Sequence, residues 1–222
     1  TATLSPTLPE ALRGGGYVLH WRHASANVCE DALGLGPAAT TAMPGWWTSC
    51  EANCATATAR QLNDKGRAES QAIGEAVHIL RIPLGRVVSS EFCRNVSTAA
   101  LMDLGPPIEE SPAITYFVYD EAHRCAASYA LIAETPAAGT NTALIGHAGF
   151  SAPCPVLASL QWAEAAVFRP DGVGGSTFVT RLAADEWDGL LPGGPSGLSA
   201  TLDQSHVRLT WTNGPEYPTV RV

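Results

Sequence analysis

Positive charge and long apolar runs are scarce in this sequence. Of its 222 residues, 13 are Lys or Arg and 21 are Asp or Glu, so the formal net charge is −8. Nucleic acids and anionic membranes are bound through basic surfaces, and we therefore expect neither as a main partner. No apolar run approaches the roughly 18 residues that a membrane-spanning helix needs. An anionic substrate would have to be bound by a local cluster of cations.

Two motifs of metal-dependent and nucleotide-dependent enzymes are also missing. The sequence has no cluster of aspartates and no glycine-rich phosphate-binding loop, so we expect neither a metal nor a cofactor. It has no internal repeat. Hydrophobic residues make up 45% of the chain and charged residues only 15%, which is typical of a packed globular protein. The length suits one core.

The cysteine content indicates an oxidising compartment. Six cysteines form an even set, which favours three disulfides and leaves their pairing open. A zinc site is the alternative, but the pair Cys50 and Cys54 lacks a second close pair of ligands. The chain begins at Thr1 with no charged and apolar leader, as a mature exported protein would; a trimmed chain would begin in the same way. We expect a secreted or periplasmic protein.

The apolar periodicity predicts alternating strands and helices. Strands are expected at residues 17–21, 86–90 and 142–146 and on both sides of a turn at 171–175, and helices at 66–80, after the cap Asn63, and at 94–102. Residues 105–136 are ambiguous: 114–120 could form a strand and 121–132 a helix. The last stretch suits a terminal strand or hairpin. Residues 25–60 lack a period and read as a long functional or disulfide-linked excursion. The pattern predicts an α/β fold: a three-layer sandwich whose mostly parallel central sheet has helices on both faces.

Four polar residues follow the predicted strands. His23, preceded by Arg22, ends the first strand, and His147 ends a later one; Arg94 begins the helix after another. If these strands are parallel neighbours, the four side chains meet at one edge of the sheet. Two guanidinium groups and two imidazoles beside a helix N-terminus suit a doubly charged tetrahedral anion. One histidine at a strand end is more often structural, so the prediction depends on the combination.

The order of these motifs resembles the histidine phosphatase superfamily, which includes the phosphoglycerate mutases and the histidine acid phosphatases, and in particular its exported bacterial members. The matching segments are YVLHWRHAS (17–25), QLNDKGRAESQAIGEAV (61–77), VVSSEFCRNVSTAAL (87–101), NTALIGHAGF (141–150) and AEAAVFRPDG (163–172). We therefore expect a phosphoglycerate mutase-like domain over residues 1–187, with an N-terminal arm, and a C-terminal extension over 188–222 packed on the same domain.

The resemblance implies phosphoryl transfer in two displacements. His23 would attack phosphorus as a neutral imidazole and form a phosphohistidine, which water then hydrolyses. Arg22, Arg94 and His147 would bind the equatorial oxygens, and protonated His147 would offset charge in the transition state. The family's reaction implies no metal and no cofactor. The partner would be a small phosphorylated substrate.

The sequence departs from the family pattern at the leaving-group acid. Ala148 stands where parts of the family carry that acid directly after the second histidine, and Ala24 replaces the usual glycine after the first. Glu164 and Glu134 are the candidate acids. We favour Glu164 because similar bacterial sequences carry a glutamate there, although a solvated carboxylate at a strand end is an equally good interpretation.

The resemblance also suggests how the cysteines pair. It favours Cys54 with Cys93, directly before Arg94, and this leaves Cys29 with Cys50 and Cys125 with Cys154.

The sequence predicts a metal-independent phosphomonoesterase acting through a phosphohistidine. One alternative is a phosphate- or phosphosugar-binding protein with degenerate catalysis. Another is a phosphoglycerate mutase-like phosphotransferase, which fits poorly with six cysteines. The substrate would depend on residues 25–60 and 105–136, which match the family least, and neither the substrate nor the oligomeric state follows from the sequence.

Overall fold

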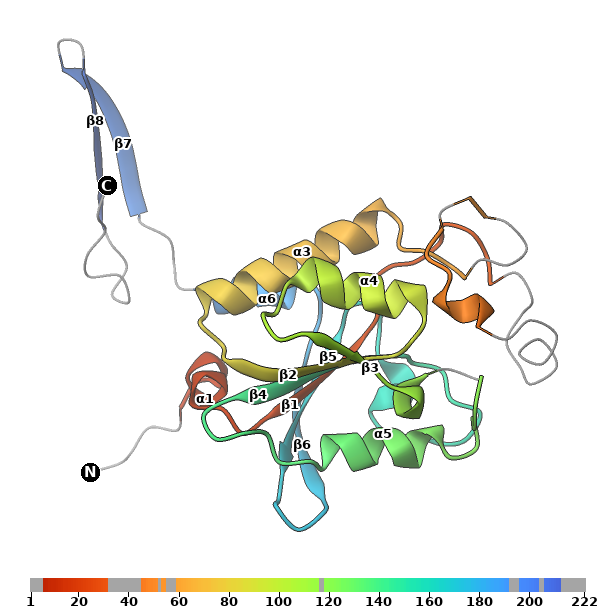
Figure 1. Ribbon diagram of the computed structural model, residues 1–222. Coiled ribbons are helices and arrows are strands. Elements are labelled where there is room, and N and C mark those ends of the chain that lie inside the picture. Colours follow the sequence, from red (N-terminus) through yellow and green to blue (C-terminus); the bar gives the residue numbers. More distant parts are fainter. Residues whose placement is uncertain are drawn as a thin grey trace.

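A computed structural model gives the fold (Figure 1). It describes residues 6–31, 45–51, 53–54, 59–115, 118–191, 196–203 and 206–212, the last two segments by their backbone only. Most of the excursion predicted between residues 25 and 60 lies outside these ranges.

The centre of the molecule is a sheet of six strands in the order β3-β2-β4-β1-β5-β6. Its strands are β1 (Val18–Arg22), β2 (Leu84–Ser89), β3 (Ile108–Glu110), β4 (Asn141–Gly146), β5 (Ala165–Pro170) and β6 (Ser176–Leu182). The first four are parallel, and β5 and β6 continue the sheet antiparallel. The predicted mostly parallel sheet is confirmed.

Helices cover both faces of this sheet (Figure 1). One face packs against α3 (Asp64–Ile79), α4 (Cys93–Met102) and α6 (Glu186–Leu190), and the other against α5 (Arg124–Ile132). Strand alternation explains the two cores: Leu19 and Trp21 of β1 join the first core, whereas Val18 joins the second. The three-layer α/β sandwich is confirmed.

The shorter elements are the ones that apolar periodicity did not predict correctly. Helix α1 (Leu8–Gly14) precedes β1, and three 3₁₀ helices are η1 (Trp46–Thr48), η2 (Pro112–Ile114) and η3 (Leu157–Ser159). The strand predicted at 114–120 is wrong in its described residues, where η2 ends and no strand follows. Strand β3 was not predicted, because three residues are too few to show an alternating pattern.

The C-terminal segment forms a separate hairpin. Strands β7 (Ser196–Asp203) and β8 (His206–Thr212) pair with each other as a two-stranded antiparallel sheet, which Figure 1 draws apart from the six-stranded sheet. Leu190 and Leu191, near the start of the extension, do pack against the core. Packing of the whole extension on the domain stays a prediction. None of the helices in the described ranges has the length and apolar character of a membrane span.

Three disulfides are formed, two of them with partners other than those expected. The pairs are Cys29–Cys54, Cys50–Cys93 and Cys125–Cys154. The expected pairs Cys54–Cys93 and Cys29–Cys50 are therefore wrong, and Cys125–Cys154 is as expected.

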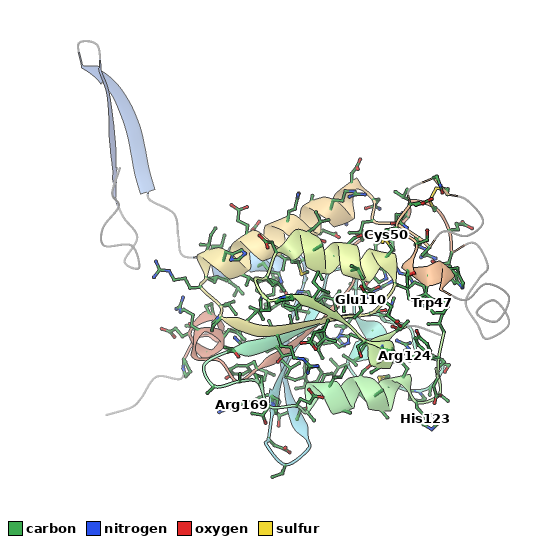
Figure 2. The ribbon with its side chains drawn as sticks, viewed as in Figure 1. Trp47, Cys50, Glu110, His123, Arg124 and Arg169 are labelled. Atoms are coloured by element: carbon green, nitrogen blue, oxygen red, sulfur yellow. A yellow bond between two sulfur atoms is a disulfide. The ribbon has the colours of Figure 1, made fainter. Side chains whose placement is uncertain are left out.

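Aromatic packing explains the Cys50–Cys93 pair. The Trp46 ring lies 5.7 Å from the ring of Phe92, the residue before Cys93, so η1 brings Cys50 to the start of α4. Trp47 and Cys50 are labelled in Figure 2 beside this end of the helix.

Helices α3 and α4 lie in close contact at Gly74. A Cβ at this position would overlap the backbone carbonyl of Met102 at the end of α4. Gly74→Ala should therefore lower the free energy of unfolding by about 1–3 kcal/mol, as overpacking of a core does. Urea unfolding measures this, with Gly189→Ala as the control because a Cβ there meets no atom. Equal stability of the two variants would contradict this close contact.

Candidate active site

The carboxyl end of β1 is held by backbone hydrogen bonds on both sides. The Arg22 amide donates to the Glu164 carbonyl at 3.0 Å, and the His23 amide donates to the Gly146 carbonyl at 3.0 Å. The His23 carbonyl in turn accepts from the Ala163 amide at 3.2 Å. These bonds fix the direction in which the side chains of Arg22 and His23 leave the strand.

Helix α4 is joined to the same strand ends. The Asn95 side-chain amide donates to the carbonyls of Ile145 at 3.2 Å and Gly146 at 2.7 Å. The Ala24 amide donates to the Thr98 hydroxyl at 3.1 Å. The first turn of α4 is thus fixed against β4 and against the residue after His23.

The four residues predicted to meet do lie together. Arg94 Nε donates to His23 Nε2 at 3.3 Å, and the rings of His23 and His147 have centroids 5.4 Å apart. These three side chains are buried. Arg22 is half-buried; one of its nitrogens donates to the Leu160 carbonyl at 3.0 Å. The result is a buried cluster of two imidazoles and the Arg94 guanidinium, with Arg22 near enough for its charge to lower the pKa of both rings.

The hydrogen bonds of His23 define its tautomer. Nδ1 lies 2.8 Å from the Ala24 carbonyl oxygen, which can only accept, so Nδ1 carries the hydrogen. Nε2 then has the lone pair, and it faces Arg94. This is the state that a nucleophilic imidazole requires.

Burial lowers the pKa of His23 well below its ordinary value, and the Arg94 guanidinium lowers that pKa further. The pKa of His147 is lowered well below its ordinary value by the same two causes. Both imidazoles are therefore neutral near neutral pH. A bound dianion would favour the protonated form of either ring.

Asp31 belongs to this cluster although the sequence did not point to it. Its carboxylate accepts from Arg94 Nη1 at 3.0 Å, and both side chains are only 4% exposed. Arg60 lies 3.6 Å from the other oxygen. Asp31 orients the guanidinium and offsets part of its charge. It lies in the irregular excursion, where no period or motif marks it.

The two candidate acids differ in position. Glu164 is 9% exposed, and its carboxylate accepts from the Gln161 amide at 2.7 Å and lies 3.9 Å from Arg181. Its backbone adjoins Arg22, and its described side-chain contacts are with Gln161 and Arg181 rather than with His23.

Glu134 instead pairs with Arg86, which is opposite Thr142 at the beginning of β4. It therefore lies at the other end of the sheet from His23 and His147. In the described part of the chain, no group of three or more His, Cys, Asp or Glu side chains could hold a metal ion.

No family model and no curated protein matches the chain. Solved structures do match it. The chain is similar to the protein histidine phosphatase SixA in complex with tungstate, with a TM-score of 0.51 and 18% identity over 77% of this chain and 98% of that one. It is also similar to the alpha-ribazole phosphatase from Shigella flexneri, with a TM-score of 0.50 and 13% identity over 76% and 96% of the two chains.

A third buried histidine makes stability depend on pH. His20 of β1 packs against Gly146, and burial lowers its pKa to about 4. As pH falls below about 6.5, the unfolded chain takes up a proton at this residue while the folded chain does not, so stability is lost down to the folded pKa.

His20→Leu should therefore reduce the acid sensitivity of folding. Between pH 7 and pH 4 the wild type should lose about 3 kcal/mol more stability than the variant does. Urea unfolding at the two pH values measures both losses, so a change in baseline stability cancels. Equal losses in the two proteins would contradict a neutral, buried His20.

Proposed function

Since the chain has the fold of the histidine phosphatases, we propose that it is a metal-independent phosphomonoesterase that acts through a phosphohistidine at His23. The observation that supports this most directly is the state of His23. Its Nε2 lone pair lies in a buried cluster of cations, with Arg94 Nε 3.3 Å away. A nucleophile and an anion-binding group are thus adjacent.

In the first displacement, His23 Nε2 forms a bond to phosphorus while the bond from phosphorus to the leaving-group oxygen breaks. That oxygen takes a proton from a general acid. Arg22, Arg94 and His147 stabilise the equatorial oxygens, and the fork geometry of the two arginines suits two oxygens at once. In the second displacement, water attacks phosphorus and gives its proton to the carboxylate that acted as the acid. The P–N bond breaks, inorganic phosphate departs, and His23 is again a neutral imidazole.

The depressed pKa values serve the two histidines differently. Burial and Arg94 keep His23 neutral and therefore nucleophilic. The substrate's two negative charges raise the pKa of His147 on binding, so this ring takes up a proton when it can donate to a phosphoryl oxygen. Deprotonation of bound His147 should limit the rate at high pH.

We propose Glu164 as the leaving-group acid because it directly precedes β5 and adjoins Arg22. Its carboxylate would have to leave its present contacts with Gln161 and Arg181 and reach the leaving-group oxygen when a substrate binds. The same contacts favour the alternative function, a phosphate- or phosphosugar-binding protein with degenerate catalysis. A mutase-like phosphotransferase gains no support from the described residues.

The setting follows from the disulfides and the charge. Three disulfides are compatible with an extracellular protein, and we propose a secreted or periplasmic enzyme. Its partner would be a small phosphorylated molecule, and the net charge of −8 makes nucleic acid and anionic membranes unsuitable.

His23→Ala should abolish turnover of p-nitrophenyl phosphate, lowering kcat by roughly 1,000-fold or more because the covalent route is lost. His123→Ala, at an exposed position directly before α5, is the matched control and should keep full activity. A labelled phosphoenzyme should be trapped by acid-free quenching in the wild type only. Normal turnover by His23→Ala would exclude the mechanism.

The variant Glu164→Gln, together with the choice of substrate, distinguishes a phosphomonoesterase from a binding protein with degenerate catalysis. If Glu164 protonates the leaving group, kcat should fall roughly 100-fold or more on an alkyl phosphate and far less on an aryl phosphate, whose leaving group needs no acid. Glu75→Gln, exposed on α3, is the control. Equal effects on both substrates would rule out Glu164 as the acid. A wild type that turns over aryl but not alkyl phosphates would favour the binding protein.

A further inference from the structure

A chain of hydrogen bonds leads from His147 to the protein surface. His147 Nε2 lies 2.9 Å from the Ser90 hydroxyl, which lies 3.4 Å from the Thr115 hydroxyl. The Thr115 hydroxyl is 3.0 Å from one oxygen of Glu91, and the Tyr119 hydroxyl is 3.0 Å from the other. His147, Ser90 and Thr115 are buried, whereas Tyr119 is 52% exposed.

The donor and the acceptor of each hydrogen bond in this series can be assigned. An ionised carboxylate only accepts hydrogen bonds, and each hydroxyl has a single hydrogen. Burial and the bond to Glu91 raise the pKa of Tyr119 to about 12, so Tyr119 donates to Glu91. Thr115 gives its hydrogen to Glu91, sharing it with the Ser111 carbonyl at 2.9 Å. Thr115 therefore accepts from the Ser90 hydroxyl, and Ser90, whose single hydrogen is then used, accepts from His147 Nε2.

We propose that Glu91 is a positioning residue that acts on His147 through Thr115 and Ser90. The chain holds His147 in the tautomer with hydrogen on Nε2. The same hydrogen bonds connect His147 to the negative charge of Glu91, which stabilises the ring when it becomes protonated. The effect on catalysis rests on the proposed function, whereas the tautomer does not.

The groups around His147 explain why such a counter-charge is useful. Besides burial, four groups lower the pKa of His147: Arg94 on α4, His23 directly after β1, Arg124 on α5 and Arg22 at the end of β1. The Phe92 ring, with its centroid 5.2 Å away, covers another side. Among the described side chains, Glu91 is the carboxylate that these hydrogen bonds connect to His147. Asp31 and Glu121 pair with Arg94 and Arg124 instead.

The tautomer can be measured without any turnover. In ¹⁵N NMR spectra of the full chain with labelled histidine, His147 of the wild type should have its hydrogen on Nε2. Thr115→Val and Glu91→Gln should both admit the Nδ1–H tautomer, and Thr115→Ser should restore the wild-type spectrum. Glu110→Gln on β3 removes an exposed carboxylate outside the chain and should change nothing. Unchanged His147 signals in Thr115→Val and Glu91→Gln would overturn the proposal.

The pH profile of aryl phosphate turnover tests the second part. Thr115→Val and Glu91→Gln should lower kcat more than they change KM, and should move the high-pH limb of kcat down by about half a pH unit or more, because protonated His147 loses support. If the high-pH limb moved in Glu91→Gln but not in Thr115→Val, the Glu91 charge would act through space. That result would refute a role for the hydrogen bonds through Thr115 and Ser90. If the wild type had no turnover, the proposed function would fail. The NMR spectra would still show whether the hydrogen bonds from Glu91 set the tautomer of His147.

Discussion

The Gly146 carbonyl at the end of β4 is the point on which the candidate site depends. It accepts from the His23 amide at 3.0 Å and from the Asn95 side chain at 2.7 Å, so one oxygen joins β1, β4 and α4. Each of these elements provides one member of the site directly beside the junction: His23, His147 and Arg94. Their separation follows from backbone geometry rather than from flexible side chains, and the cluster is therefore formed before any anion binds.

The same junction concentrates positive charge among buried side chains. Taking a guanidinium out of water costs several kcal/mol unless it is paired, and here Asp31 partly neutralises Arg94 while both imidazoles stay neutral. A phosphoryl dianion would complete this balance. The fold itself therefore holds these groups together, and binding of an anion would need no rearrangement of the strands.

Much of the fold could be predicted from the sequence because local patterns control it. The helical spacing after Asn63 predicts α3, and the Asn63 side chain does accept from the Gly66 amide at 2.8 Å. Apolar runs locate β1, β2 and β4, and strand β3 was missed because it is short. The pairing of the cysteines was harder to predict, since Cys50 and Cys54 are only four residues apart and local sequence does not show which of them pairs with Cys93. Packing of Trp46 on Phe92 favours Cys50, and no local pattern encodes that contact.

The sequence by itself determined that Arg22 and His23 come at the end of β1, that His147 directly follows β4 and that Arg94 lies in the first turn of α4. Residues at strand ends and helix starts are specified by position along the chain. Only the tertiary structure decided what surrounds them. Arg94 contacts Asp31, Asn95 contacts Gly146 and Ser90 contacts Thr115. Each of these pairs joins segments far apart in sequence, and they meet because parallel strands bring their carboxyl ends to one edge. Contacts between such segments depend on three-dimensional packing, which leaves no periodic trace.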